Sequence, residues 1–202
     1  MQKDEIVGIF GGSFSPPHIG HVRAARAFVE AEGLDRLLVI PVALPPHKSS
    51  EGVVSPEHRL NMCRLAFGAI DRAEISDCEM RRGGKSYTSD TLEYFTKKGR
   101  RLVFLCGTDM FLTLESWHEF RKIFALAKIA FIRRENTVDP EILRAKADDY
   151  RRLYSAEVSE IVIPAIEISS TDIRFELGQG IDTTKYLSPE VASYIKEHGL
   201  YK

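Results

Sequence analysis

Two histidines and a run of small residues follow the first apolar segment of the chain. The stretch Gly8-Ile-Phe-Gly-Gly-Ser-Phe-Ser-Pro-Pro-His18-Ile-Gly-His21 lies between a strand-like segment and an amphipathic helical one. Glycines at the end of a strand allow a tight turn, and the next helix directs its free N–H groups at an anion. His18 and His21 are three residues apart, so both rings can reach an anion held at this helix face. The segment predicts a phosphate site at residues 11–21.

Other sites with similar residue types are less consistent with this segment. It has neither the G-x-G-x-x-G pattern of dinucleotide sites nor the G-x-x-x-x-G-K-[ST] pattern of P-loops. Zinc helices of metalloproteases use histidines at i, i+4 with a glutamate between them, and neither condition holds here. Taken one at a time, the features also fit capping histidines or a plain glycine turn. Their order directly after a first strand favours the phosphate site.

Short β-rich apolar runs alternate with longer helical patterns, which is typical of a parallel sheet covered by helices. The predicted strands are 6–10, 37–42, 73–76, 102–106, 129–132 and 161–163. The predicted helices are 19–32, 56–69, 88–98, 117–127, 140–153, 170–177 and 189–198. We therefore expect an α/β fold, a Rossmann-like doubly wound parallel sheet. The chain is expected to form one domain, 1–202, with a small C-terminal helical extension from about residue 168.

Composition and charge argue against some classes of function, such as nucleic-acid binding. Lysine plus arginine number 28 and aspartate plus glutamate 29, so no overall positive field favours nucleic acid. The longest apolar run, 37–44, is far shorter than the roughly 20 residues needed to span a bilayer. The first residues do not follow the pattern of a secretory leader, so we expect them to be retained in a cytoplasmic protein. Three cysteines without a C-x-x-C pair are interpreted as core thiols.

The first motif resembles the G-x-F-x-P-x-H-x-G-H signature of the nucleotidyltransferase superfamily of adenylyl- and cytidylyltransferases. A second segment, Ile168-Ser-Ser-Thr-Asp-Ile-Arg174, resembles the I-S-S-T-x-I-R element of the same superfamily. Read alone, its hydroxyls fit an ordinary helix N-cap and its arginine a solvated charge. Together the two motifs imply nucleotidyl transfer, with His18, His21 and Arg174 as the catalytic residues.

Segments between the two motifs resemble the bacterial nicotinate-nucleotide adenylyltransferases, over nearly the whole chain. They are Pro45-Pro-His-Lys48, Ser86-Tyr-Thr88, Gly107-Thr-Asp109 and the Trp-His-Glu-Phe stretch that begins at Trp117. The resemblance implies ATP contacts from Gly11, Gly12, Ser13, Phe14, His18, His21, Gly107, Asp109, Ser170, Thr171 and Arg174. It implies mononucleotide contacts from Lys48, Thr88, Trp117, His118 and Arg134.

These residues also have physical readings of their own. The face of Trp117 suits a flat pyridinium cation, although a core tryptophan looks the same in sequence. An ionised Asp109 can accept from two ribose hydroxyls, although it can equally be a helix N-cap. Lys48 can contact a phosphate or be an ordinary surface charge.

The chemistry implied by the resemblance is transfer of AMP from ATP to the 5′-phosphate of nicotinate mononucleotide, giving nicotinate adenine dinucleotide and pyrophosphate in NAD biosynthesis. The attacking phosphate has a second pKa of about 6, so no general base is needed. Mg²⁺ is expected to be carried by the ATP phosphates, with few protein ligands. The signature often has aspartate where this chain has Ser15, and we expect the serine to brace the loop through nearby backbone.

Two alternatives stay open. Another nucleotidyltransferase, similar to pantetheine-phosphate adenylyltransferase or a cytidylyltransferase, would share the histidine motif. A sensor that binds nucleotide without turnover would share the fold, and Ser15 favours it while the retained His18, His21 and Arg174 oppose it. Preference for the acid over the amide of the mononucleotide, and the oligomeric state, have no clear signal in the sequence.

Overall fold

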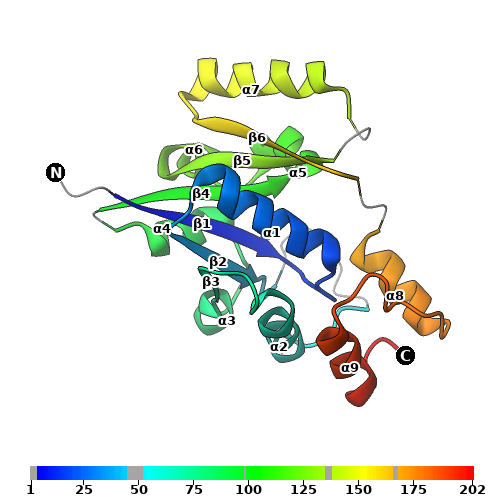
Figure 1. Ribbon diagram of the computed structural model, residues 1–202. Helices are drawn as coiled ribbons and strands as arrows, with labels where there is room; N and C mark the ends of the chain where they lie inside the picture. Colours follow the sequence, from blue (N-terminus) through cyan, green and yellow to red (C-terminus); the bar gives the residue numbers. More distant parts are fainter. Residues whose placement is uncertain (1–3, 45–51, 98, 135–137, 166–167) are drawn as a thin grey trace. The chain divides into compact units, whose positions relative to one another are not determined.

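Six strands form one sheet in the order β3-β2-β1-β4-β5-β6, which is the order of a doubly wound Rossmann-type sheet (Figure 1). The computed structural model describes residues 4–44, 52–97, 99–134, 138–165 and 168–202. The strands are β1 Glu5–Gly12, β2 Arg36–Pro41, β3 Ala73–Ile75, β4 Arg100–Gly107, β5 Ala127–Arg134 and β6 Val158–Ile163. All six predicted strands and the predicted fold class are confirmed.

The helices are α1 Ile19–Glu32, α2 Pro56–Phe67, α3 Cys78–Arg82, α4 Thr88–Phe95, α5 Thr108–Thr113, α6 Phe120–Leu126, α7 Pro140–Tyr154, α8 Ser170–Gly178 and α9 Pro189–Glu197. A short 3₁₀ helix, η1, spans Leu114–Ser116. All seven predicted helices are present. The predicted start of one is wrong, because α6 begins at Phe120 and not at Trp117. The sequence interpretation also missed α3, α5 and η1.

The chain divides into two compact units. The first unit comprises residues 1–10, 24–38 and 87–165, and the second comprises residues 11–23, 39–86 and 166–202. In the first unit β1, β4, β5 and β6 pair in parallel, with Phe10 opposite Leu105 and Cys106 opposite Phe131. The central residues of β4 and β5, 102–106 and 129–132, are apolar and buried, as expected of a sheet covered on both faces.

Helices cover both faces of the sheet in the first unit, with α1 in front and α4 and α6 behind (Figure 1). Gly8 in β1 allows α1 to approach closely, since a Cβ there would lie 2.8 Å from Cε1 of Phe28 in that helix. On the other side, the Phe111 ring stacks on Phe131 at 4.1 Å, and Tyr150 Oη donates to Phe111 O at 2.7 Å. These aromatic contacts connect α5, β5 and α7.

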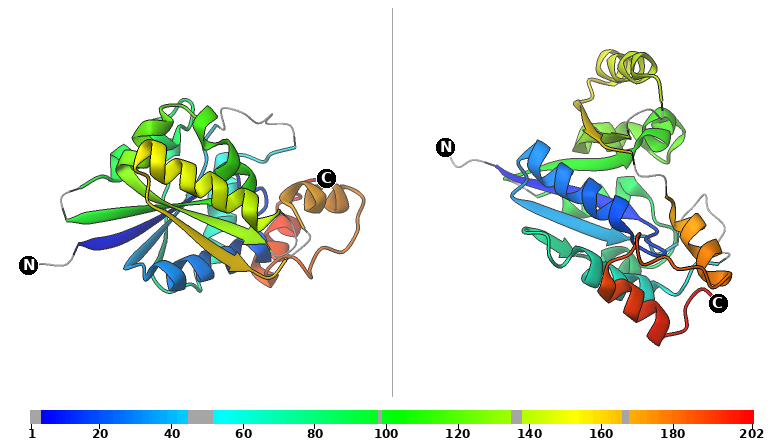
Figure 2. Two further views of the ribbon diagram at one scale, coloured as in Figure 1. Left: turned by 90° about the horizontal axis from the view of Figure 1, so that it is seen from above. Right: turned by 45° about the vertical axis from the view of Figure 1, so that its right-hand side comes forward.

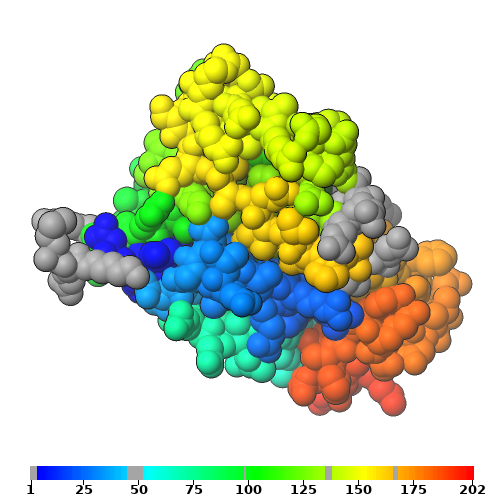
Figure 3. Space-filling view, turned by 45° about the horizontal axis from the view of Figure 1, so that its top comes forward, coloured from blue at the N-terminus to red at the C-terminus, as the bar shows by residue number. Residues whose placement is uncertain are grey.

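Helix α7 lies beside β6 in both views of Figure 2, and Arg151 Nη2 donates to Val158 O at 3.0 Å. Much of α7 is at the molecular surface in the space-filling view (Figure 3). Asp139 accepts from Glu141 N at 2.9 Å and caps the helix, whose first residue is Pro140.

In the second unit, α2 is capped by Ser55, whose side chain accepts from His58 N at 3.4 Å. Helix α9 lies against α2, where Tyr194 Oη and His58 Nδ1 are 3.0 Å apart. Strand β3 follows α2, and Ser76 N donates to Val39 O at 2.9 Å.

All three cysteines are buried and free, as predicted. Burial raises the pKa of each thiol, which keeps the thiols protonated. None of the helices in the described ranges has the length and apolar character needed to cross a membrane.

Candidate active site

The first motif forms the turn between β1 and α1, within the second unit. Strand β1 ends at Gly12, and α1 begins at Ile19. His18 directly precedes the helix and is 4% exposed, whereas His21 lies in its first turn and is half-buried. The two rings are close, with centroids 3.8 Å apart. The structure therefore brings both predicted histidines to one helix start.

Backbone amides determine the orientation of both imidazoles. Gly20 N donates to His18 Nδ1 at 3.1 Å, and His18 N donates to His21 Nδ1 at 3.2 Å. Because Nδ1 accepts in each ring, the proton of the neutral imidazole is on Nε2. Gly20 is part of this arrangement, since a Cβ there would lie 3.0 Å from both Cε1 and Nδ1 of His18. Each histidine thus carries an Nε2–H donor of fixed tautomer, which suits a phosphate oxygen.

Phe14 stabilises the turn from its buried side. Its backbone φ is +48°, in the left-handed region that a bulky residue rarely adopts. The ring is 1% exposed and packs edge-on against His21 at 5.1 Å and Phe67 at 5.5 Å. A Cβ at Gly12 would lie 2.8 Å from Phe14 Cζ, so glycine at that position leaves room for the ring. Burial of Phe14 offsets the cost of its backbone conformation.

The second motif is hydrogen-bonded to the same turn. Ser169 caps α8 in a reciprocal capping box with Asp172. Ser170 Oγ donates to Pro16 O at 2.9 Å, and Arg174 Nη1 donates to Ser15 O at 2.9 Å. Two motifs about 150 residues apart in sequence therefore meet through direct hydrogen bonds. Arg174 also donates to Thr171 Oγ1 at 3.1 Å, so its guanidinium has a fixed orientation.

The Ser15 side chain is hydrogen-bonded to a residue far away in the sequence. Its side chain is fully buried, and its Oγ shares a hydrogen bond of 2.9 Å with Tyr201 Oη. Burial raises the pKa of Tyr201 to about 12, so this hydroxyl stays protonated. The expected bracing role of Ser15 rested on nearby backbone as its partner. The hydroxyl instead pairs with a side chain 186 residues away.

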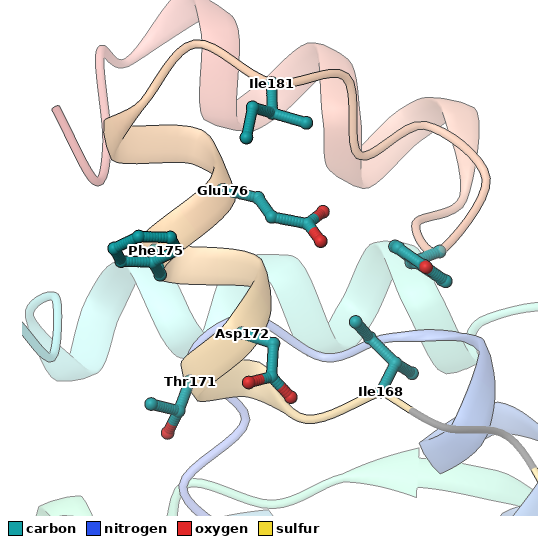
Figure 4. A pocket seen from close by; sticks show the side chains of 7 residues that line it. Ile168, Thr171, Asp172, Phe175, Glu176 and Ile181 are labelled. Atoms are coloured by element: carbon teal, nitrogen blue, oxygen red, sulfur yellow. The ribbon is translucent and has the colours of Figure 1, made fainter.

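A hollow of about 540 Å³ lies against α8 (Figure 4). It is lined by Ile168, Thr171, Asp172, Phe175, Glu176, Ile181 and Tyr186. In Figure 4 the carboxyl groups of Asp172 and Glu176 extend to the side of α8 on which Ile168 lies. Two carboxylates do not suit a phosphate, and of the expected site residues only Thr171 lines this hollow. We therefore do not assign the hollow to nucleotide phosphates.

The residues expected to contact the mononucleotide lie mainly in the first unit. Thr88 is the first residue of α4, and Arg134 is the exposed last residue of β5. His118 is exposed, and its ring lies 4.2 Å from that of Tyr87, so the Ser-Tyr-Thr and Trp-His segments meet. Trp117 is half-buried, with its ring edge-on to Phe104 at 6.2 Å. Partial exposure distinguishes Trp117 from a fully buried core residue.

Gly107 and Asp109 stand where β4 passes into α5. Gly107 is the N-cap residue of α5, and Asp109 is an exposed residue of its first turn. The alternative reading of Asp109 as the N-cap is therefore wrong. A Cβ at Gly107 would lie 2.9 Å from Asp109 Oδ1, so the glycine allows this carboxylate to lie over the strand end.

Lys48 lies outside the described residues. The described start of its loop is attached to the Ser-Tyr-Thr segment, since Ala43 N donates to Ser86 Oγ at 3.1 Å. Ser86 N in turn donates to Leu44 O at 3.1 Å.

The sequence interpretation missed Arg59 of α2, which is 2% exposed. Its Nη1 donates to Ser13 O at 3.0 Å, so it contacts the backbone of the phosphate turn. A signal was present, because Arg59 occupies a position of the helix face on which Met62, Cys63, Ala66 and Phe67 are buried. A charged side chain buried at such a position requires hydrogen-bond partners, so it indicates that the side chain binds specific acceptors.

The described residues contain no group of three or more histidine, cysteine, aspartate or glutamate side chains placed to hold a metal ion. A Mg²⁺ ion that arrives with ATP needs few protein ligands, so this donor set is compatible with ATP-borne magnesium.

Comparison with known proteins places the chain among nucleotidyltransferases. The family model described as cytidylyltransferase-like matches residues 9–176. A protein of Trichlorobacter lovleyi named "Probable nicotinate-nucleotide adenylyltransferase" is 37% identical, over 97% of this chain and 99% of its own. A protein of Geobacter metallireducens with the same name is also 37% identical, over 96% of this chain and 97% of its own.

Solved structures show the same fold. The chain superimposes on nicotinic acid mononucleotide adenylyltransferase of Plasmodium falciparum complexed with NaAD, with a TM-score of 0.80 and 23% identity. The alignment covers 98% of this chain and 97% of the other. The same enzyme complexed with APC gives a TM-score of 0.77 at 21% identity.

Proposed function

The chain belongs to the nicotinate-nucleotide adenylyltransferases, within the cytidylyltransferase-like family, and on this premise we propose that it adenylylates nicotinate mononucleotide. It would transfer AMP from ATP to the 5′-phosphate of the mononucleotide, releasing pyrophosphate and nicotinate adenine dinucleotide. The observation that carries the proposal is the arrangement of residues 13–21. The imidazoles of His18 and His21 have fixed tautomers there, and Arg174 donates to Ser15 O in the same segment.

The reaction is an in-line displacement at the α-phosphorus of ATP. An oxygen of the mononucleotide phosphate forms the new bond, and the bond from the α-phosphorus to the bridging oxygen of the β-phosphate breaks. The nucleophile is already ionised near neutrality, so the protein's task is placement and charge stabilisation. His18, His21 and Arg174 would donate to the phosphate oxygens on which negative charge accumulates.

For the other predicted site residues we propose roles that rest on the resemblance to the family. The ATP phosphates would be contacted by backbone N–H groups of the turn, at Gly11, Gly12, Ser13 and Phe14. The start of α8, at Ser170 and Thr171, would contact them as well. Gly107 and Asp109 would contact the adenosine, with the exposed carboxylate accepting from ribose hydroxyls.

On the mononucleotide side, we propose that the half-buried Trp117 stacks on the pyridine ring. Thr88 and His118, at the start of α4 and directly after Trp117, would supply donors for the nicotinate carboxylate. Lys48 and Arg134 would contact the mononucleotide phosphate. Mg²⁺ bound to ATP would neutralise part of the triphosphate charge when present.

Pyrophosphate release tests the proposal directly. The protein is incubated with ATP, Mg²⁺ and nicotinate mononucleotide, and in parallel reactions with nicotinamide mononucleotide or 4′-phosphopantetheine. We expect rapid pyrophosphate release with the nicotinate compound. Faster release with phosphopantetheine would indicate another nucleotidyltransferase, and ATP binding without product from any acceptor would indicate a sensor.

His21→Ala is expected to lower kcat by about 10²–10³-fold, the usual effect of removing one transition-state donor. The fold should persist, because His21 is half-buried and its loss leaves Phe14 in contact with Phe67. The measurement is steady-state kinetics beside circular dichroism. His198→Ala removes an exposed histidine that follows α9 and serves as the control, with near-normal kcat. Near-normal turnover of the His21 variant would overturn the catalytic assignment.

The proposal includes a single domain over residues 1–202 and a cytoplasmic location, both of which are expectations from the sequence.

A further inference from the structure

Arg59 is a buried cation within the apolar face of α2. It is 2% exposed, and the neighbouring positions of this face carry Met62, Cys63 and Phe67. Burial lowers the pKa of its guanidinium, which means that the charged form loses hydration there. A methionine could fill the same space without this cost. The hydrogen bonds that its N–H groups donate must therefore explain why an arginine is present.

The guanidinium donates to four backbone carbonyls. Nη1 donates to Ser13 O at 3.0 Å and to Val42 O at 2.6 Å. Nη2 donates to Ala43 O at 3.3 Å, and Nε donates to Val54 O at 3.2 Å. All these acceptors belong to the second unit, as Arg59 does. The planar fork of arginine can serve several fixed acceptors at once, whereas a lysine ammonium cannot match that geometry.

The acceptors come from two parts of the chain that are separate in sequence. Ser13 is part of the turn that carries the phosphate-site histidines. Val42 and Ala43 directly follow β2, and Val54 directly precedes the cap of α2. Val42, Ala43 and Val54 thus all accept hydrogen bonds from Arg59. A further bond, from Val42 N to Gly12 O at 2.9 Å, joins the same two parts of the chain beside the guanidinium.

We propose that Arg59 is a positioning residue that holds the phosphate turn in register with Val42, Ala43 and Val54. The inference rests on the proposed function, in which the turn binds the ATP phosphates. One side chain then sets the placement of the turn without touching a substrate. Its loss would impair ATP binding and turnover.

Arg59→Lys tests this proposal, because it keeps the positive charge and most of the aliphatic side chain but removes the planar guanidinium. We expect kcat/KM for ATP to fall at least tenfold, with a small change in melting temperature. Arg59→Met, which removes every donor, should reduce kcat/KM further. Arg64→Lys is the matched control, since Arg64 is an exposed residue of the same helix that donates to Asn61 Oδ1.

Hydrogen exchange gives a readout that does not depend on activity. In Arg59→Lys, amides of residues 11–15, 42–44 and 52–54 should exchange faster, while those of α9 keep their protection. If wild-type protein makes no product, the proposed function fails, and hydrogen exchange still tests the role of Arg59.

Three outcomes would overturn the positioning role. One is a folded Arg59→Lys variant with wild-type kcat and KM values, and another is unchanged exchange in the three segments. If neither variant folds, Arg59 is a folding residue and the proposal fails.

Discussion

Ser15 shows how one short side chain can take over a bracing role in the phosphate turn. The nucleotidyltransferase signature often has aspartate here, and an aspartate would bring a second charge close to Arg174. The serine is fully buried, its carbonyl accepts from Arg174 Nη1, and its hydroxyl pairs with Tyr201. The bracing of the turn in this chain therefore involves Tyr201.

Tyr201→Phe is expected to lower the free energy of unfolding by about 1–3 kcal/mol near pH 8, because it leaves the buried Ser15 hydroxyl without this partner. The tyrosine pKa is raised to about 12 in the folded protein, against about 10 in an unfolded chain. The folded state thus binds the phenolic proton more tightly. This contribution is fully present below pH 10 and is lost as the pH rises through 12.

Urea unfolding of wild type and Tyr201→Phe at pH 8 and pH 11 measures the effect. We expect the difference between the two proteins to be smaller at pH 11. Ser15→Ala is the control background, in which Tyr201→Phe should cost less because the partner hydroxyl is already gone. A difference that is independent of pH and of Ser15 would mean that the hydrogen bond contributes nothing.

At the scale of elements, apolar periodicity predicted the long segments, and most short helices escaped. The longer strands and the long helices α1, α2 and α7 were visible because their apolar spacing extends over several residues, and the three-residue strand β3 was also predicted. Helix α5 has only the six residues Thr108–Thr113, too few for a period to be evident. The predicted helix at 117–127 began too early because Glu119 adopts a φ of +48°, which separates η1 from α6. Glutamate carries no local signal for that conformation.

The same contrast applies to the candidate site. His18, His21 and Arg174 were predictable because their motifs are contiguous in sequence. Tyr201 was not assigned a role, because a contact across 186 residues depends on the whole path of the chain. Arg59 could have been found, since a charge on a buried helix face is visible in the heptad-like spacing of α2.

Helix α8 supplies an element-scale prediction. Ser169→Ala removes the side-chain acceptor of Asp172 N and should cost about 0.5–2 kcal/mol of stability. Because α8 carries Ser170, Thr171 and Arg174, fraying of its first turn should also lower kcat/KM for ATP, by up to about tenfold.

Asp139→Ala is the matched variant, since it removes a side-chain cap of the same kind from α7. It should cost similar stability and leave kcat/KM unchanged. Chemical denaturation and ATP-dependent kinetics of both variants provide the comparison. Equal kinetic losses would show that α8 has no special part in ATP binding.

At the scale of the whole molecule, the expectation of a single domain predicts that the chain unfolds cooperatively. Three of the five boundaries between the two compact units fall within β1, α1 and β2, so these elements contribute residues to both units. Breaking a strand or helix at an internal peptide is costly, because its hydrogen bonds form cooperatively. We therefore expect the two units to unfold in one transition.

Trp117, the only tryptophan, makes this expectation testable, because its fluorescence reports on the first unit alone. Ile70→Val trims a buried residue of the second unit and Ile129→Val one of the first, each at a cost of about 0.5–1.5 kcal/mol. In one cooperative domain, Ile70→Val lowers the fluorescence-detected melting temperature by a few degrees, as Ile129→Val does. Far-UV circular dichroism should give coincident transitions in both variants. If Ile70→Val shifts the dichroism but not the fluorescence of Trp117, the units unfold separately and the single-domain expectation is wrong.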